Sequence, residues 1–258
     1  MSITITPLNS GMCTSNPKTY HYHPSTHKYY ANVSNEDKAL PVFCYLLNTG
    51  DELILIDTGM SDTDRANTYH HPGSVQLPDE AMPRAVMKAG YNPDDVTKII
   101  FTHLKDFKNA KYYAQRKEYE FAMNPIPLYY KSYEYKDLGI EAPFIGVKFE
   151  LIDGEAEIVP GVRVYPTPGH SPGHQAVEVD TKDGTYHCVG DAIFLLDNLK
   201  PVPQIHYDLT PTARFANIVE WWESVREIKR RCPDIKMVLP AHEPTLIERF
   251  KETPVLGL

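Results

Sequence analysis

The stretch Val162-Arg-Val-Tyr-Pro-Thr-Pro-Gly-His-Ser-Pro-Gly-His174 decides which fold this chain adopts. Alternating apolar residues predict a strand over Val162–Pro166, and two Pro-Gly pairs then predict a stiff loop. Proteins often place ligand-binding side chains on loops at strand ends, because the sheet holds such loops in position. His170 is therefore a candidate functional residue, whereas His174 is expected to support the loop.

Three more polar residues follow apolar runs elsewhere in the chain. His103 follows Ile-Ile-Phe-Thr, Asp191 follows the strand that ends in Val-Gly190, and His242 follows Met-Val-Leu-Pro-Ala. Any one of them is unremarkable alone, since a histidine after a strand is usually only hydrogen-bonded. Together, three imidazoles and one carboxylate at strand ends form a natural set of zinc ligands.

The surrounding pattern predicts an α/β protein. Apolar runs and turn residues predict a hairpin of strands 41–47 and 52–57, further strands at 3–8, 97–102, 111–115, 147–152, 157–159, 175–180, 185–189 and 234–239, and helices at 78–90, 116–123 and 211–231. The nearly continuous apolar strands indicate sheets covered by helices. Because no segment has a linker-like composition, we expect residues 1–258 to form one domain of two similar halves.

Composition limits the classes of function. The 258 residues are 42% hydrophobic and 23% charged, which is typical of a globular protein. The net charge of −8 argues against binding to nucleic acid or to an anionic membrane surface. The start of the chain lacks a signal-peptide pattern, and four widely spaced cysteines predict reduced thiols. We therefore expect a cytoplasmic protein with a small-molecule substrate, whereas the sequence gives no prediction of oligomeric state.

The order of these residues resembles the metallo-β-lactamase superfamily. The matching segments are Leu-Ile-Asp57-Thr-Gly, Phe-Thr-His103-Leu, Thr-Pro-Gly-His170-Ser-Pro-Gly-His174, Gly-Asp191 and Ala-His242. The loop with two Pro-Gly-His units, together with Tyr112-Tyr-Ala-Gln-Arg-Lys-Glu-Tyr119, is most similar to the N-acyl-homoserine lactonases, a branch of quorum-quenching enzymes. The resemblance implies an αββα sandwich, in which two mixed β-sheets are flanked by helices.

The resemblance also implies a site. Members commonly hold two metal ions, which makes His103 and His170 ligands of one metal, His242 a ligand of the other, and Asp191 the bridge between them. Such metals polarise the carbonyl of a lactone or ester and activate a water molecule. The lactonases place a tyrosine three residues after the bridging aspartate. Here that substrate-binding position is Phe194, which has no proton to give.

One departure from the family pattern affects the metal ligands. The family motif His-x-His-x-Asp-His aligns with the segment His103-Leu-Lys-Asp-Phe-Lys108 of this chain. Without a gap, the second His, the Asp and the last His are replaced by Lys105, Phe107 and Lys108. With a gap, a short stretch after Leu104 is missing. Both alignments remove three expected ligands, for which Asp106 is the one available substitute. We therefore expect one metal ion at most, zinc or alternatively iron, manganese or cobalt.

These features predict a metal-dependent hydrolase of lactones or related esters, impaired by the loss of ligands and without an assigned catalytic side chain. One alternative is an inactive member or deletion form that keeps the fold as a binding module. Another is a thioester hydrolase, whereas the acidic charge disfavours phosphodiester cleavage.

Two further groups of residues have more than one interpretation. His21 and His23 are expected in a solvated loop, with the mouth of a pocket as the alternative. The tyrosines in an aromatic cluster could form a lid, an interface or simple packing; they are Tyr129, Tyr130, Tyr133 and Tyr135.

Overall fold

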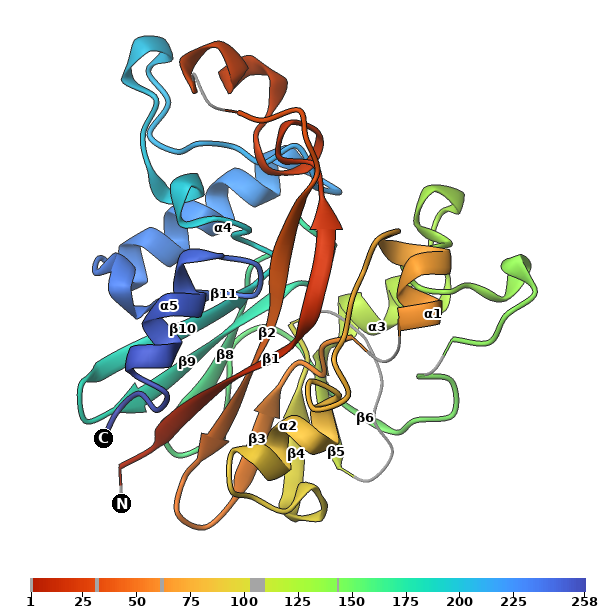
Figure 1. Cartoon of the computed structure of the whole chain (residues 1–258), viewed down its shortest axis with the longest axis vertical. Coiled ribbons are helices and arrows are strands. Elements are labelled where there is room, and N and C mark those ends of the chain that lie inside the picture. Colours follow the sequence, from red (N-terminus) through yellow and green to blue (C-terminus); the bar gives the residue numbers. More distant parts are fainter. Residues whose placement is uncertain (1, 31–32, 61–62, 103–109, 143) are drawn as a thin grey trace.

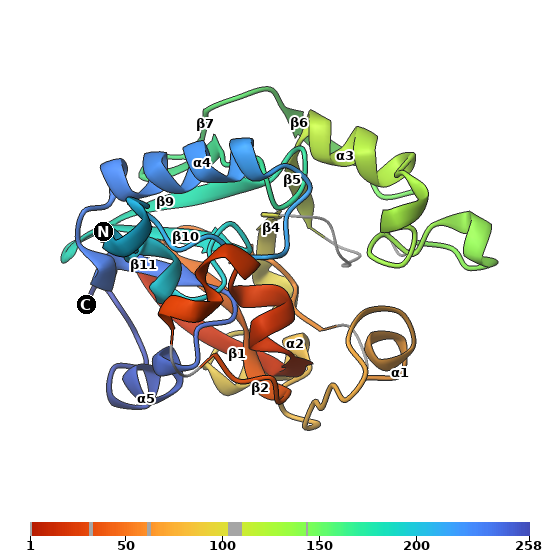
Figure 2. The same ribbon diagram turned by 90° about the horizontal axis from the view of Figure 1, so that it is seen from above.

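The computed structural model describes residues 2–30, 33–60, 63–102, 110–142 and 144–258. Two β-sheets face each other and helices lie outside them (Figures 1 and 2). The first sheet has the strand order β1-β2-β3-β4-β5-β6, and the second has the order β11-β10-β9-β8-β7. The first part of the chain therefore forms one sheet and the later part forms the other, in the expected αββα arrangement.

The first sheet is mixed. Its strands are β1 (Thr4–Ser15), β2 (Lys38–Asn48), β3 (Leu53–Ile56), β4 (Val96–Ile100), β5 (Lys111–Gln115) and β6 (Phe149–Ile152). Strands β1 to β3 pair antiparallel and β3 to β6 pair parallel. The strand predicted over 3–8 continues to Ser15, because a register shift between Asn9 and Met12 keeps β1 paired with β2.

The second sheet is mixed as well. Its strands are β7 (Ala156–Val159), β8 (Val162–Pro166), β9 (Gln175–Thr181), β10 (Gly184–Gly190) and β11 (Val238–Pro240). Only β10 and β11 are a parallel pair among its described pairings. The strand predicted over 234–239 is shorter, because a single helical turn, η9 (Ile235–Met237), precedes β11.

Five α-helices and several short helical turns connect the strands. The helices are α1 (Thr63–Arg65), α2 (Met82–Lys88), α3 (Arg116–Met123), α4 (Ile218–Arg231) and α5 (Thr245–Glu252) in the described residues. The turns are η1 (Pro17–His21), η2 (Pro24–Tyr29), η3 (Ala66–His70), η4 (Pro93–Asp95), η5 (Pro127–Tyr129), η6 (Lys136–Leu138), η7 (Leu196–Leu199) and η8 (Pro203–Ile205). Helix α5 was not predicted from the sequence.

Helix α4 begins later than the predicted helix over 211–231. The Asn217 side chain accepts hydrogen bonds from the backbone N–H groups of Val219 and Glu220, which makes it the N-cap. The preceding backbone has other partners, since the Ala216 N–H donates to the Gly169 carbonyl at 2.6 Å. The irregular segment 211–216 therefore packs on the Pro-Gly-His loop instead of extending the helix.

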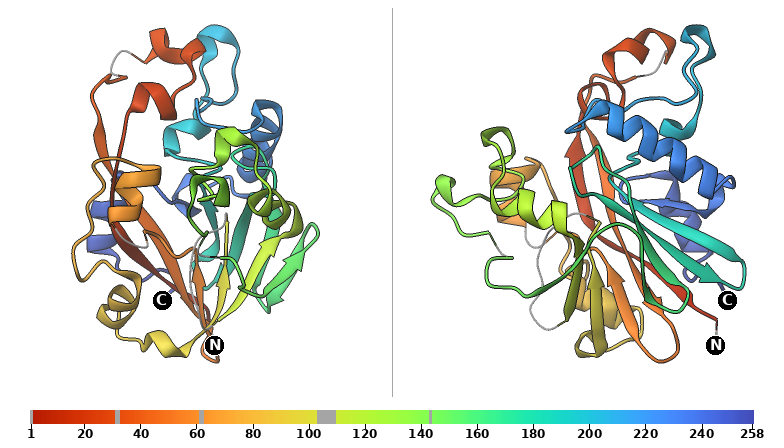
Figure 3. Two further views of the ribbon diagram at one scale, coloured as in Figure 1. Left: turned by 90° about the vertical axis from the view of Figure 1, so that its right-hand side faces the viewer. Right: turned by 180° about the vertical axis from the view of Figure 1, so that it is seen from behind.

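Three apolar clusters hold the layers together. Strands from both sheets share the central cluster, which includes Ile54, Val177 and Leu239. Helix α4 covers the outer face of the second sheet (Figure 2), and α2 packs on the outer face of the first. The two ends of the chain lie near each other in every view (Figure 3), and Ile5 pairs with Leu256. Burial on both faces accounts for the continuous apolar runs of the central strands.

The cysteines are reduced, as predicted, and the helices are too short or too polar to span a membrane in the described residues. All four cysteines, Cys13, Cys44, Cys188 and Cys232, are buried free thiols. In the part of the chain that the structure describes, none of the helices has the length and apolar character needed to cross a bilayer.

Candidate metal centre

Three of the four expected ligands converge where strands of the second sheet end. His170 lies in the loop after β8, Asp191 directly follows β10, and His242 follows β11 by two residues. The Nε2 atom of His170 is 3.4 Å from Asp191 Oδ2, and Nε2 of His242 is 3.2 Å from Asp191 Oδ1. Each carboxylate oxygen therefore faces a different imidazole, which is the arrangement that a bridging ligand requires.

The spacing of these atoms fits metal binding. Two ligands of one tetrahedral zinc ion, each about 2.0–2.1 Å from the metal, lie about 3.4 Å apart. His170 with Asp191, and His242 with Asp191, each supply two such donors. Within the described ranges, no group of three or more His, Cys, Asp or Glu side chains could hold an ion. His103 and residues 104–108 lie outside the described residues, so the third ligand and the truncated motif stay predictions.

His242 is oriented through its second ring nitrogen. Its Nδ1 donates to the Pro41 carbonyl at 2.8 Å, which turns Nε2 toward Asp191. Burial lowers the pKa of His242, but the charges of Asp191 and Cys13 and their hydrogen bonds to the ring together outweigh it and hold that pKa well above its usual value. A metal ion that binds here must therefore displace a proton.

Glycine is required at two positions of the Pro-Gly-His loop. Gly169 has φ +131°, and a Cβ there would lie 2.3 Å from the Trp221 Cα of helix α4. A Cβ on Gly173 would lie 2.0 Å from the Glu118 backbone nitrogen of helix α3. The loop that carries His170 is thus wedged between two helices, and only residues without a side chain permit this approach.

A buried carboxylate secures the same loop. Glu118 is 1% exposed and accepts hydrogen bonds from Ser171 Oγ at 2.6 Å and from the Gly173 N–H at 3.1 Å. Its other oxygen accepts from the Tyr133 hydroxyl at 2.7 Å. Three donors satisfy this carboxylate, which links α3 and the 130s segment to the metal centre.

His174 supports the loop, as the sequence predicted. Its Nε2 accepts from the Asp191 backbone N–H at 3.2 Å, and its Nδ1 lies 2.8 Å from Thr167 Oγ1. We assign the proton to Nδ1, because Nε2 acts as the acceptor. Both ring nitrogens are engaged, so His174 is not available as a ligand.

Asp57, part of the Leu-Ile-Asp-Thr-Gly match, secures the end of β4. It has φ 58°, which is unusual for a residue with a side chain. Its carboxylate accepts from the Thr102 backbone N–H and hydroxyl, each at 2.8 Å. Asp57 thus fixes the point from which the chain continues to His103.

The centre opens into a cavity of about 310 Å³. Phe194 lines it, and its ring centroid lies 5.8 Å from that of His242 and 5.6 Å from that of His170. The apolar part of the wall includes Leu40, Phe43, Met60, Ala66 and Phe101. The cavity can therefore accept a substrate with an apolar portion next to the carboxylate and imidazoles.

The prediction of a solvated loop is wrong for His21, which is 1% exposed and lines the cavity. Its ring stacks on Phe194, and its Nε2 lies 3.1 Å from Ser15 Oγ. Burial, followed by the charges of His242 and Arg214, lowers the pKa of His21 to about 4. The segment lacks a regular period, so only its tertiary contacts reveal the burial.

Other cavity residues were predicted in part or missed. Tyr129 and Tyr133 line the cavity, whereas Tyr130 and Tyr135 stack on each other with centroids 4.7 Å apart. Arg214 also lines the cavity. It was missed because its segment was assigned to a helix and no motif marks it.

The fold and the site define an αββα metallo-hydrolase, and the comparisons with known proteins agree. The model of the metallo-beta-lactamase superfamily matches residues 37–242. An N-acyl homoserine lactonase of Bacillus thuringiensis is 32% identical over 208 residues, which cover 74% of this chain and 78% of the relative. A probable metallo-hydrolase of Mycobacterium tuberculosis is 25% identical over 246 residues, covering 83% and 78%.

Solved structures share the fold. An N-acyl homoserine lactone hydrolase with N-hexanoyl-L-homoserine at its catalytic metal centre superposes with a TM-score of 0.71 at 26% identity, covering 98% of this chain and 97% of the other. The dizinc quorum-quenching lactonase AidC has a TM-score of 0.68 at 17% identity, covering 94% and 88%. The chain belongs to the metallo-β-lactamase superfamily and is by family a metallo-hydrolase.

Proposed function

We propose that the chain is a metal-dependent hydrolase of lactones or related esters that holds one divalent metal ion. Zinc is the ion that this ligand chemistry favours, although iron, manganese and cobalt accept the same ligand types. The observation that carries the proposal is the convergence of His170, Asp191 and His242 on one side of a partly apolar cavity. Similarity to N-acyl homoserine lactonases supports the substrate class.

Each residue has a separate part in this proposal. His170 and Asp191 hold the ion together with His103, the expected third ligand. A bound ion polarises a substrate carbonyl and lowers the pKa of a water molecule. His242 faces the second oxygen of Asp191 and orients that carboxylate. Phe194 covers both imidazoles and offers the substrate an apolar surface without a proton donor.

The test is a substrate panel on the zinc-loaded chain and on its Asp191→Asn variant. The panel holds acyl-homoserine lactones, simple lactones, aryl esters and thioesters. We expect turnover of lactones or esters, and a loss of roughly a hundredfold or more in the variant, because the asparagine carries no charge to hold the ion. Undiminished turnover by the variant would refute the assignment of Asp191. No turnover by a fully loaded chain would favour a binding module, and turnover of thioesters alone would favour the thioester hydrolase.

A further inference from the structure

Arg214 is an unusual side chain in the wall of the cavity. It is half-buried and lies in the irregular segment before α4. The segment is tied to η1, because the Thr212 hydroxyl and the Ala213 N–H both donate to the Tyr20 carbonyl, at 2.5 and 3.1 Å. The guanidinium carbon lies 5.3 Å from the centroid of the Tyr20 ring. The position of this cation in the cavity is therefore fixed by the fold.

No carboxylate in the described residues forms an ion pair with Arg214. The three acidic side chains that line the same cavity are engaged elsewhere: Glu134 with Arg65, Asp57 with Thr102, and Asp191 with the two imidazoles. The guanidinium lies over the Tyr20 ring, which uses none of its N–H donors. These donors have no acceptor among the described side chains. A half-buried guanidinium with unused donors is suited to bind a planar anion in a bidentate manner.

The groups around Arg214 complete an anion-binding region. Tyr129 and Arg214 line the same cavity, in which burial raises the pKa of Tyr129 and the charge of Arg214 opposes this rise. The Tyr129 hydroxyl has no hydrogen-bond partner among the described residues. The Nδ1 atom of buried His21 likewise has none there. One cation and two neutral polar groups, contributed by three segments, thus face the same cavity as Phe43 and Met60.

We propose that this cavity selects substrates that carry a carboxylate in addition to the lactone or ester, and that Arg214 binds this carboxylate. The inference rests on the proposed hydrolase function, since the substrate must also reach His170 and Asp191. It sets this chain apart from an enzyme for neutral acyl chains. Tyr129 supplies a hydrogen-bond donor in the same cavity, and the apolar wall accommodates the chain that joins the two ends of the substrate.

The test measures binding of two ligands that cannot be hydrolysed as esters. Decanedioic acid monoamide carries a carboxylate, and decanamide is its neutral counterpart. Calorimetry is performed on the zinc-loaded chain and on the chelator-treated chain. We expect the monoamide to bind roughly ten- to a hundredfold more tightly than decanamide in both, because a charge-assisted bidentate contact is made with only one ligand. Equal affinities would overturn the proposal.

Three variants test whether Arg214 causes the preference for the monoamide over decanamide. Arg214→Met should remove it while leaving the affinity for decanamide unchanged, and Arg214→Lys should keep only part of it. Arg226→Met is the matched control, because Arg226 also lies over an aromatic ring, that of Trp222, but outside the cavity. A preference that survives Arg214→Met would refute the role of Arg214, and one that survives only in the zinc-loaded chain would place the carboxylate on the metal ion.

Failure of this inference is distinguishable from failure of the hydrolase function. The binding measurement needs no turnover, so a carboxylate preference that depends on Arg214 stands even if no ester is cleaved. Conversely, efficient cleavage of neutral lactones with no preference for the monoamide would retain the hydrolase and reject the anion site. Unfolding curves of each variant show whether it is folded.

Discussion

Phe194 is one of the positions at which the sequence departs from the pattern of the lactonases that it resembles. Its ring lies beside the rings of His170, His242 and His21. Phenylalanine keeps this position apolar. The resemblance implies a tyrosine at this position in the lactonases, and Phe194 offers no hydroxyl there.

Phe194→Tyr should raise the rate of lactone cleavage by the zinc-loaded chain about tenfold, because a hydroxyl can donate to the substrate carbonyl or leaving group. Steady-state kinetics on one lactone measure the effect. Phe194→Leu is the control, since it removes the ring without adding a proton. No gain in a folded, zinc-loaded Phe194→Tyr variant would argue against a role for this position in proton donation.

Glu118 acts at a distance from the chemistry, through the loop that holds His170. Glu118→Gln should lower the free energy of unfolding by about 1.5–3 kcal/mol. The substitution replaces one carboxylate oxygen by an NH2 group, which cannot accept the hydrogen bonds that this oxygen now accepts. Urea unfolding measures the change. Glu120→Gln on the exposed side of the same helix is the matched control and should change little. Equal effects of both substitutions would show that the loop does not depend on Glu118.

Site residues differ in how far the sequence could reveal them. His170, Asp191 and His242 follow apolar strands that can be recognised in the sequence from the alternation of their residues. The structure brings these three side chains together. His21 and Arg214 lie in irregular segments, and the hydrogen bonds between those segments decide their burial. Contacts between residues almost two hundred positions apart leave no local pattern in a sequence.

At the scale of elements, local signals placed most boundaries well. The predicted strand 111–115 and helix 116–123 coincide with β5 and α3. Helix α4 was placed too early because apolar spacing continues before Asn217, whereas the side chain of Asn217 caps the helix there. Strand β1 was predicted too short, since its second half depends on pairing with β2 and not on alternation alone.

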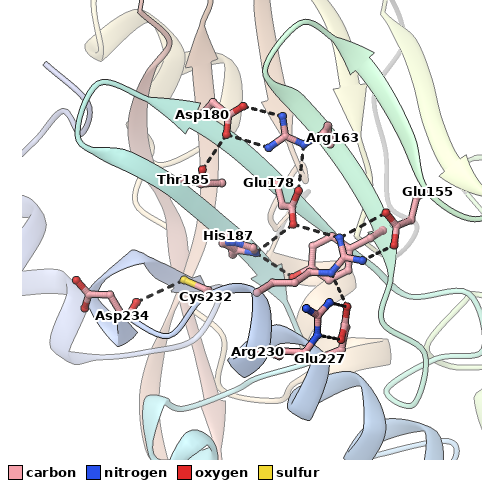
Figure 4. A network of polar contacts seen from close by, with 12 residues as sticks. Glu155, Arg163, Glu178, Asp180, Thr185, His187, Glu227, Arg230, Cys232 and Asp234 are labelled. Carbon is pink, nitrogen blue, oxygen red and sulfur yellow. Dashed lines mark hydrogen bonds and ion pairs between the residues drawn. The ribbon is translucent and has the colours of Figure 1, made fainter.

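A polar network joins the end of α4 to the second sheet (Figure 4). Arg231 forms ion pairs with Glu155, Glu178 and Glu227, and its guanidinium carbon lies 4.3 Å from the centroid of the Tyr165 ring. The side chains of Arg231 and Glu178 are only 21% and 12% exposed. This partial burial makes their pairing less screened by solvent than a surface ion pair.

Arg231→Met should therefore lower the free energy of unfolding by about 1–2 kcal/mol, because it removes the cation shared by three carboxylates and leaves the partly buried Glu178 with Arg163 alone. The adjacent Arg230 is 69% exposed at its side chain and pairs with Glu227. Arg230→Met is the matched control and should cost at most about 0.5 kcal/mol. Chemical unfolding of both variants tests the difference, and equal losses would contradict the role of the buried pair.

His187 on β10 gives the stability a pH dependence. It is 2% exposed, and its Nδ1 lies 3.0 Å from the Tyr165 hydroxyl. Burial is the main cause that lowers the pKa of His187 below 6.5, while Glu178 opposes the shift and Arg231 adds to it. The folded chain therefore keeps this imidazole neutral at a pH where the unfolded chain binds a proton.

The sign follows from this difference in proton binding. Stability contributed by neutral His187 is present above pH 6.5 and declines as the pH falls toward the lower pKa of the folded state. Between about pH 7 and 5.5, the free energy of unfolding should fall less steeply in His187→Gln than in the unaltered chain. The difference between the two slopes should be at most roughly 1.4 kcal/mol per pH unit. Urea unfolding across this range measures the slopes, and identical slopes would contradict the assignment.

For the whole molecule, the two sheets meet at the candidate metal centre as well as in the core. The Phe43 N–H donates to the Ala241 carbonyl at 2.9 Å, and the Tyr45 hydroxyl donates to the Pro240 carbonyl at 2.7 Å. The ends of β10 and β11 are thereby fixed against β2. Because both sheets share one apolar cluster, we propose that residues 1–258 form a single domain.

Metal content links the folded structure to the function. Asp191 faces one imidazole with each oxygen, but each position has only two donors in the described residues, and the sequence after Leu104 lacks three ligands of the family motif. We expect His103 to bring one position to three protein ligands, which is the number typical of a catalytic zinc site. We expect the other position, with His242 and Asp191, to have too few ligands for tight binding.

The most direct measurement is a zinc titration of the chelator-treated chain, by calorimetry, next to its Asp191→Asn variant. We predict one equivalent for the unaltered chain and no binding of comparable affinity in the variant. Two tightly bound equivalents, none at all, or a variant that binds zinc like the unaltered chain would contradict a single metal ion held on Asp191.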